Sequence, residues 1–407
     1  MQVHFALKYN QFAKSTSLLL VLKTMKKVII MIDTARASGR KFLRGIERYL
    51  RSNPHWEVCL QPPHYLPSHN FNVRSWFHLQ DADGLIARDS PHTAGLLNLN
   101  IPKIINDTKY ENPGASVIYT NSEKTGEMAA NYFIGLGFRH YAFCGFEGLA
   151  WSERRCKTFS ESLDTNGFSS VFNYHDWPDA AKQTETERWT IAEWLKTLPK
   201  PVCVFACNDD RGVYILEACK IVGLKVPEEV AVLGVDNDEL TCDLSSPPLS
   251  SIELNFERGG FETAGLLDEL MSRGKSSRNI IIEPIDIITR QSTNVFSVDD
   301  EEVAKALRFI REHYKEPLQV KHVVAATVLS RRDLELKFKN KLRRSIKDEI
   351  NRLRIESVKR KLINSSDTIY NIAATLEYTD PQHFSRFFRQ VAGTSPTEFR
   401  RRHRPYA

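Results

Sequence analysis

Short apolar runs alternate with longer amphipathic segments through the first 290 residues of this 407-residue chain. The run Val28–Ile32 is apolar at every position, whereas Phe42, Ile46 and Leu50 recur at intervals of four. A short continuous run is typical of a buried strand, and an interval of four predicts a helix with one apolar face. Further strands are predicted at 56–60, 84–87, 103–105, 141–143, 202–206 and 230–235, and further helices at 122–136, 153–163, 187–198, 212–222 and 258–271.

Strands and helices that alternate in this way form parallel sheets with helices on both faces. Gly137, Gly167 and Gly223 each follow an apolar helical stretch, where glycine can adopt the left-handed conformation that closes a helix. No GxGxxG motif follows the first strand and no GxxxxGK motif occurs, so the phosphate-binding loops of nucleotide-binding α/β proteins are missing. We therefore predict an α/β fold for residues 25–294 and no cofactor.

Two helix-turn-helix signatures follow one another near the C-terminus. The second, predicted at about 368–391, combines Ile372-Ala373-Ala374 with the aromatic pair Phe384 and Phe388, and Gly393 follows its last helix. A helix-turn-helix lays its second helix in the major groove of DNA. Two such motifs in tandem indicate a DNA-binding domain.

The first signature, predicted at about 319–342, has the same frame. Ser330 and Asp333 form an S-x-x-D capping box, and the apolar stripe of the next helix recurs at intervals of four: Leu334, Phe338 and Leu342. Val328 stands where a turn glycine is common, as Glu377 does in the second unit. Because a β-branched residue is strained at positive φ, we expect the first turn to be built differently.

Charge separates the two parts of the chain. The region from Glu301 to Ala407 carries 24 Lys plus Arg against 13 Asp plus Glu, a net of +11, whereas the whole chain carries +6, which leaves −5 for residues 1–300. A basic domain beside an acidic one is what a phosphate-binding module joined to a domain with another task looks like. The alternative is that Lys and Arg only solvate helix faces.

The cysteines and the N-terminus bear on location. The seven cysteines are odd in number and form no CxxC motif, which favours a reducing cytoplasm over disulfides or a metal site. The apolar run Leu18–Leu22 is shorter than the roughly 7–15 residues of a signal peptide core. We predict that residues 1–24 form a disordered extension, and whether the natural protein has them is left open.

Polar residues follow several predicted strands, at the edge where doubly wound proteins bind ligands. Carboxylates and amides form paired hydrogen bonds with hydroxyl groups, and an aromatic ring such as Trp151 can stack on the apolar face of a sugar. The alternative is that these residues are helix caps and turn formers. They are Asp33, Asn208, Asp209, Asp236 and Asn237.

Three segments resemble the effector domains of the lactose/galactose-repressor group: 152–155, 206–209, and 233–237 with 249–252 downstream. That group is similar to periplasmic sugar-binding proteins, so the resemblance implies two α/β lobes that close on a monosaccharide in a cleft between them. The group's usual N-terminal helix-turn-helix is absent from this sequence. The sugar contacts that the resemblance implies are Asp33, Arg40, Arg154, Asn208, Asp209, Asp236 and Asn237, with Asp236 and Arg154 as the principal ones.

Residues 303–402 resemble the AraC-type DNA-binding domain, in which a long helix bridges two helix-turn-helix units. Joined to a repressor-like sugar domain through a short linker at 295–302, such a domain resembles operon regulators that respond to D-xylose. Arg332 and Arg386 are the best candidates for guanine, because a guanidinium matches its O6 and N7. The residues expected to read DNA are Arg332, Glu335, Leu336 and Lys339 in the first unit, and Gln382, His383, Ser385 and Arg386 in the second.

Other basic residues of this region admit two interpretations, since they either contact phosphates or solvate a helix. They are Arg352, Arg354, Lys359, Arg360 and Lys361 on the connecting helix, and the tail 400–402.

The resemblance implies a cytoplasmic regulator that binds a monosaccharide, with D-xylose as the favoured candidate, and operator DNA, and that activates sugar-use genes. A homodimer and contact with RNA polymerase are expected. The alternatives are a repressor, a regulator for another pentose or hexose, and a sugar carrier. The sequence shows no nucleophile elbow, P-loop, metal-ligand spacing or Ser/His/Asp arrangement, so no catalytic residue, metal site or enzymatic activity is predicted.

Overall fold

The computed structural model describes residues 25–60, 81–88, 99–106, 116–168, 171–176, 184–274, 278–295, 300–342, 344–365, 367–378 and 380–403. The predicted extension at 1–24 and the linker residues 296–299 lie outside these ranges. The chain divides into two compact units. One comprises residues 1–33, 42–119 and 259–280, and the other comprises residues 34–41, 120–258 and 281–407.

The first unit is built on a six-stranded sheet with the order β11-β5-β4-β3-β1-β2. The strands β1 to β5 pair in parallel, as the alternation of strands and helices predicted. Gly260 lets α10 approach α2 closely, since a Cβ there would lie 1.9 Å from the carbonyl oxygen of Phe42. The elements are β1 (Lys26–Met31), α2 (Ala37–Ser52), β2 (Trp56–Leu60), β3 (Gly84–Arg88), β4 (Lys103–Asn106), β5 (Ser116–Thr120), α10 (Phe256–Arg273) and β11 (Ile280–Ile282).

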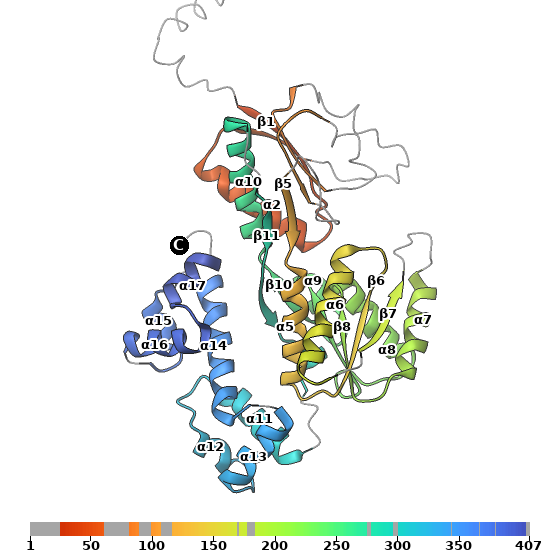
Figure 1. Ribbon diagram of the computed structural model, residues 1–407, viewed down its shortest axis with the longest axis vertical. Coiled ribbons are helices and arrows are strands. Elements are labelled where there is room, and N and C mark those ends of the chain that lie inside the picture. The colour runs from red at the N-terminus through yellow and green to blue at the C-terminus, as the bar shows by residue number, and fades with distance from the viewer. Residues whose placement is uncertain are drawn as a thin grey trace, which may run out of the picture. The chain divides into compact units, whose positions relative to one another are not determined.

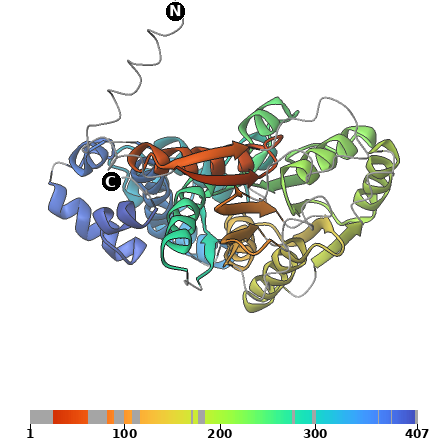
Figure 2. The same ribbon diagram turned by 90° about the horizontal axis from the view of Figure 1, so that it is seen from above.

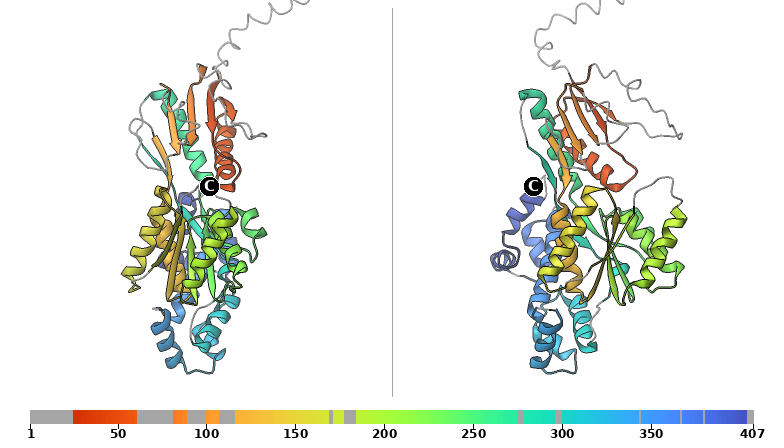
Figure 3. Two further views of the ribbon diagram at one scale, coloured as in Figure 1. Left: turned by 90° about the vertical axis from the view of Figure 1, so that its right-hand side faces the viewer. Right: turned by 45° about the vertical axis from the view of Figure 1, so that its right-hand side comes forward.

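The second unit contains another six-stranded sheet, with the order β12-β10-β9-β8-β6-β7. Only the β10–β12 pair is antiparallel among the strand pairs described in this sheet. Helices α5 and α6 cover one face, and α7 and α8 cover the other (Figures 2 and 3). The elements are α5 (Ser122–Gly135), β6 (His140–Phe146), α6 (Ala150–Thr165), β7 (Val171–Asp176), α7 (Thr184–Thr197), β8 (Val202–Ala206), α8 (Asp209–Ile221), β9 (Val230–Val235), α9 (Glu239–Leu244), β10 (Ser250–Leu254), β12 (Pro284–Ile288) and η3 (Gln291–Thr293).

Local chemistry closes the helices as the sequence predicted. Gly137, Gly167 and Gly223 have φ values of 85°, 83° and 72°, which only glycine adopts without strain. Apolar strands with every residue buried, such as β8 and β9, form the core between the flanking helices.

The C-terminal helices belong to the same unit. The long helix α14 (Ile346–Asn364) carries α11 to α13 at one end and α15 to α17 at the other (Figure 1). Each end has its own apolar core. The other helices are α11 (Glu301–His313), α12 (Val320–Ala325), α13 (Arg331–Leu342), α15 (Ile369–Ala374), α16 (Pro381–Ala392) and α17 (Pro396–His403).

Charged groups join the region around α14 to the rest of its unit. Glu349 is buried and pairs with Arg344 and with Arg352, at 2.6 and 2.8 Å. Burial alone would raise the pKa of Glu349, but Arg352 and Arg344 hold it below its usual value. Arg344 also donates to the carbonyl of Gly135 at the end of α5, at 2.7 Å. A second ion pair links Arg360 to Asp286 at 2.7 Å.

Within the described ranges, no helix is long and apolar enough to cross a membrane.

Candidate functional site

Neighbouring strands of the second sheet end in the polar residues that the sequence singled out. Asn208 and Asp209 follow β8, and Asp236 and Asn237 follow β9, which lies beside it. Asn208 caps α8, since its side-chain oxygen accepts from the backbone N–H of Arg211 at 3.0 Å. The helix-cap interpretation therefore applies to Asn208, and its predicted contact with sugar stays a prediction.

Asp209 is buried and fully engaged with its own unit. Its carboxylate accepts from the Ser251 hydroxyl at 2.6 Å and from the backbone N–H of Asp238 at 2.8 Å. Burial and the nearby carboxylate of Asp236 raise the pKa of Asp209 to about 8. Through its hydrogen bond with the Asp238 N–H, Asp209 therefore fixes the position of the segment that follows β9.

The turn after β9 has an unusual backbone. Asp236 and Asn237 have φ values of 101° and 47°, a backbone region that residues other than glycine rarely adopt. Three hydrogen bonds hold it: Asp236 N–H to the Ile252 carbonyl (2.9 Å), Asn237 N–H to the Ser251 hydroxyl (3.0 Å), and the Lys41 ammonium to the Asn237 carbonyl (3.0 Å). Such strain persists only where the surroundings enforce it, and it clusters at ligand sites.

Asp236 is the carboxylate that this turn presents. Its side chain retains 28% exposure, and one of its oxygens lies 4.0 Å from a nitrogen of the buried Arg155 guanidinium. Burial raises the pKa of Asp236 to about 6, although Arg155 opposes the shift. A partly exposed carboxylate oriented by a buried guanidinium can accept hydrogen bonds from two adjacent hydroxyl groups.

Arg155 was missed by the sequence analysis, which selected its neighbour Arg154. Arg155 donates to the Cys207 carbonyl and lies 5.0 Å from the centre of the Trp151 ring. The signal was present, because the buried residues of α6 recur at helical spacing as Ser152, Arg155, Cys156, Phe159 and Leu163.

The other predicted sugar contacts are engaged with protein partners or lie outside this turn, apart from Asn237, which belongs to it. Arg154 pairs with Glu123 on α5 at 3.4 Å. Arg40 donates to the carbonyls of Thr34 and Ala35, both at 2.8 Å, and its guanidinium lies 3.6 Å from Asp238. The remaining two are Asn237, whose buried amide oxygen accepts from Arg290 at 3.0 Å, and Asp33, which is exposed after β1 in the first unit.

The two predicted reading helices, α13 and α16, have matching patterns of burial. Each is 12 residues long, and the fourth and eighth positions are buried in both: Leu334 and Phe338 in α13, Phe384 and Phe388 in α16. The predicted stripes are confirmed. Of the predicted DNA-reading residues, Arg332, Leu336, Lys339, Gln382, His383 and Arg386 are exposed, and Glu335 and Ser385 are half-buried.

The capping predicted for the first reading helix is also found. The Ser330 hydroxyl accepts from the backbone N–H of Asp333 at 3.2 Å and donates to the Asp333 carboxylate at 2.6 Å. The turns of the two helix-turn-helix units differ, as expected from their residues. Glu377 adopts a φ of 59°, whereas Val328 is not among the described non-glycine residues with positive φ.

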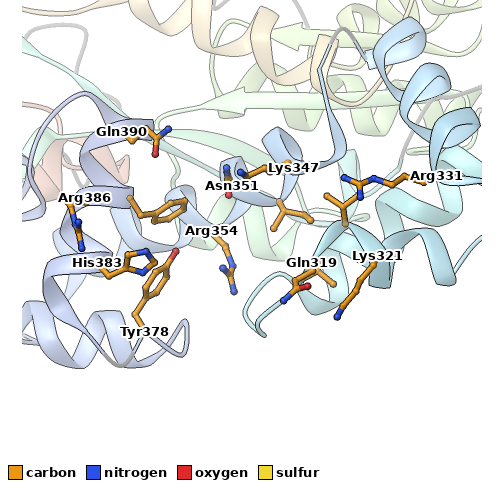
Figure 4. Close-up of a pocket in the computed structure, with 14 residues that line it drawn as sticks. Gln319, Lys321, Arg331, Lys347, Asn351, Arg354, Tyr378, His383, Arg386 and Gln390 are labelled. Atoms are coloured by element: carbon orange, nitrogen blue, oxygen red, sulfur yellow. The ribbon is translucent and has the colours of Figure 1, made fainter.

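A cleft of about 680 Å³ opens between the two helix-turn-helix units. In Figure 4 its side chains run from His383 and Arg386 at one end, past Arg354, to Gln319 and Lys321 at the other. The described residues that line it include no carboxylate. The cleft therefore presents only neutral and basic groups.

Several of the basic residues with two open interpretations are engaged within the protein. Arg354 donates to the Tyr314 carbonyl at 2.9 Å, and Arg360 pairs with Asp286. Arg352 pairs with Glu349 and Glu356, and Arg401 pairs with Glu398 at 2.8 Å. These arginines thus serve intramolecular contacts, which neither interpretation had foreseen.

Family models match two parts of the chain. Residues 130–293 match a periplasmic binding protein-like domain, and residues 323–402 match a helix-turn-helix domain. Over 385 residues the chain is 29% identical to the xylose operon regulatory protein of Haemophilus influenzae and 26% identical to that of Escherichia coli strain K12. Both alignments cover 92% of this chain, with 98% and 96% of the respective relatives.

Solved structures give the same picture of the fold. A xylose-binding transcription activator matches with a TM-score of 0.58 and 25% identity, over 93% of this chain and 98% of that one. A LacI family regulator from Enterococcus faecium with bound ribose matches 66% of this chain and 98% of its own, at 20% identity and a TM-score of 0.53. The predicted combination of an α/β periplasmic-binding-protein-like domain and a helical helix-turn-helix domain is confirmed.

Proposed function

We propose that this chain, a homologue of xylose operon regulators along most of its length, is a transcription regulator that binds a monosaccharide and operator DNA. The observation that carries the proposal is the presence of two different surfaces in one unit. One is the strained turn that presents Asp236 beside Arg155, and the other is the exposed faces of α13 and α16.

For the sugar, we propose D-xylose, because the relatives that match nearly the whole chain are named as xylose operon regulators. Asp236 is the principal contact, and Arg155 orients its carboxylate. Asp33, Arg40, Arg154, Asn208 and Asn237 stay predicted contacts of lower rank, since the partners described above already engage most of them. Asp209 stabilises the turn through its hydrogen bond with the Asp238 N–H.

For the DNA, we propose that α13 and α16 enter successive major grooves, about 34 Å apart along the duplex. The regulator activates sugar-use genes as a homodimer in the cytoplasm and contacts RNA polymerase. The sugar shifts an equilibrium between two conformations by its differential affinity for them.

The sugar site is tested by thermal unfolding of the full chain in the presence of pentoses and hexoses. At a concentration 100 times its Kd, the cognate sugar stabilises the protein by about 2.7 kcal/mol. Asp236→Asn should abolish this stabilisation. The matched control is Asp164→Asn, which removes the same charge from an exposed position at the far end of α6.

Sugar stabilisation of normal size in Asp236→Asn would show that the site is misplaced. A protein that no pentose or hexose stabilises would contradict the sugar-binding function itself. Titration with D-xylose and with a hexose distinguishes the proposed sugar from its alternatives, and transcription from a reporter promoter distinguishes activation from repression.

A further inference from the structure

Residues 290–294, which we call the connector, lie just after β12 and include η3. Ser292 and Thr293 within it are fully buried, and the Ser292 hydroxyl donates to the Val232 carbonyl of β9 at 2.7 Å. The connector is therefore packed as part of the domain built on the second sheet, although it lies close to the C-terminal helices in the sequence.

Arg290 joins one end of the connector to the strained turn after β9. Its guanidinium donates to the side-chain oxygen of Asn237 at 3.0 Å and to the Leu249 carbonyl at 3.1 Å, and it pairs with Asp243 at 2.5 Å. Asn237 is buried and directly follows Asp236, the principal proposed sugar contact. A movement of this turn therefore changes the contacts of Arg290.

Tyr132 of α5 holds the middle of the connector. Its hydroxyl lies 2.7 Å from the Thr293 hydroxyl and 3.1 Å from that of Thr289. The Thr293 hydroxyl donates its one proton to Ser250 at 2.7 Å, so Tyr132 must be the donor toward Thr293. Burial raises the pKa of Tyr132, which therefore keeps the proton that this hydrogen bond needs.

Asn294 joins the other end of the connector to the first helix-turn-helix unit. Its side-chain oxygen accepts from the Arg311 guanidinium at 2.5 Å. Arg311 belongs to α11, and the buried face of α11 forms part of the apolar core of that unit. The connector thus has the turn after β9 at one end and a DNA-binding-domain helix at the other.

We propose that the connector transmits the state of the sugar site to the DNA-binding helices, with Arg290 and Asn294 as positioning residues at its two ends. The inference rests on the proposed function and assigns residues to its regulation. A ligand shifts an equilibrium only through contacts that differ between the two conformations. Sugar at Asp236 alters the adjacent Asn237, and a connector of five residues with a buried middle passes that change on to α11.

The test measures the affinity of the full chain for an operator duplex, selected with the wild type from a random library, with and without saturating D-xylose. The ratio of these affinities is the coupling factor, which is about 5–150 in typical allosteric proteins. Asn294→Ala should lower it about fivefold, the size of one lost hydrogen bond, while D-xylose still binds the free protein. Arg290→Gln should lower it equally, and the double variant no further, because the two residues act in series.

Tyr132→Phe tests the middle of the connector with almost no change in side-chain shape, and it should also lower the coupling factor. The matched control is Tyr141→Phe on the nearby strand β6, which removes a buried hydroxyl that donates to the Phe138 carbonyl at 2.5 Å. Because Tyr141 makes no contact with the connector among the described hydrogen bonds, this control should leave the coupling factor unchanged.

A coupling factor of normal size in Asn294→Ala and Arg290→Gln would overturn the connector as the route. An equal loss in Tyr132→Phe and Tyr141→Phe would also overturn it, because general loosening of the domain would then be the cause. A wild type that D-xylose neither stabilises nor shifts on the operator would instead contradict the proposed function, and the role of the connector with it.

Discussion

The two helix-turn-helix units anchor helices α13 and α16 through apolar residues at the same helix positions, but the two helices expose different residues. Leu334 and Phe338 in α13 occupy the same helix positions as Phe384 and Phe388 in α16, and all four are buried. At the sixth position, however, the first helix exposes Leu336, whose exposed fraction is 58%, and the second exposes Arg386.

This difference separates two tasks of one helix. The buried positions decide where the helix lies, since their apolar contacts anchor it to α14 and its neighbours. The exposed positions decide what it can recognise. A guanidinium suits guanine, whereas an apolar side chain suits the methyl group of thymine. The comparison predicts that changes at the two kinds of position have separable effects.

Deletion of the core aromatics should have the largest effect. Phe338→Ala and Phe388→Ala should each cost about 3–5 kcal/mol, because each leaves a cavity in a close-packed cluster. Since the two clusters are distinct, Phe338→Ala should accelerate amide hydrogen exchange in α11 to α13 and leave α15 to α17 protected. Phe388→Ala should show the reverse pattern.

The measurement is amide hydrogen exchange followed by mass spectrometry, with thermal unfolding for the magnitude. If either variant lost protection equally at both ends of α14, the two helix-turn-helix units would unfold together, and their apolar cores would not be independent.

Replacement of the exposed residue at the sixth position should have an intermediate effect. Arg386→Ala should cost about 1–3 kcal/mol on the selected operator and relax specificity at one base position. Leu336→Ala at the matched position should cost less, because it removes one apolar contact and no hydrogen bond. Binding to a library of single-base variants of the operator measures both. Uniform weakening across that library for Arg386→Ala would identify a phosphate contact instead.

Glycine substitutions in the two turns should have the smallest effects and opposite signs. Glu377→Gly should stabilise the protein by about 0.5–1 kcal/mol, because glycine adopts a φ of 59° without strain. Val328→Gly should destabilise it by about the same amount, because it adds freedom to the unfolded chain and relieves no strain. Val328 is 81% exposed, so little packing is lost. Melting temperatures of the pair test this, and a change of the same sign in both would contradict it.

Strands and helix faces could be predicted from the sequence wherever their apolar residues follow a regular local pattern. The all-buried strands β8 and β9 were predicted from continuous apolar runs, and the stripes of α13 and α16 from their spacing. The strand β7 was not predicted, because its sequence VFNYHD alternates with polar residues and has no continuous apolar run. The short strands β11 and β12 were likewise not assigned ranges by the sequence analysis.

The candidate site was predictable only in part. The ends of β8 and β9 were predicted to bind a ligand because polar residues follow several strands, and parallel strands place their carboxyl ends together. That binding role stays a prediction. The role of Asp209 could not be predicted, because it depends on Ser251, 42 residues away in the sequence. Such distant partners decide whether a carboxylate faces a ligand or accepts a hydrogen bond from a buried hydroxyl. Spacing along the chain does not reveal them.

The contact between Gly135 and Arg344 has a consequence for substitution at position 135. A Cβ at position 135 would lie 3.0 Å from a guanidinium nitrogen of Arg344, which already donates to the carbonyl of the same residue. Alanine there would press on an arginine that also neutralises Glu349. Positions 135 and 344 are 209 residues apart, and alanine at 135 would require the Arg344 guanidinium to shift by a few tenths of an ångström while it keeps its contact with Glu349.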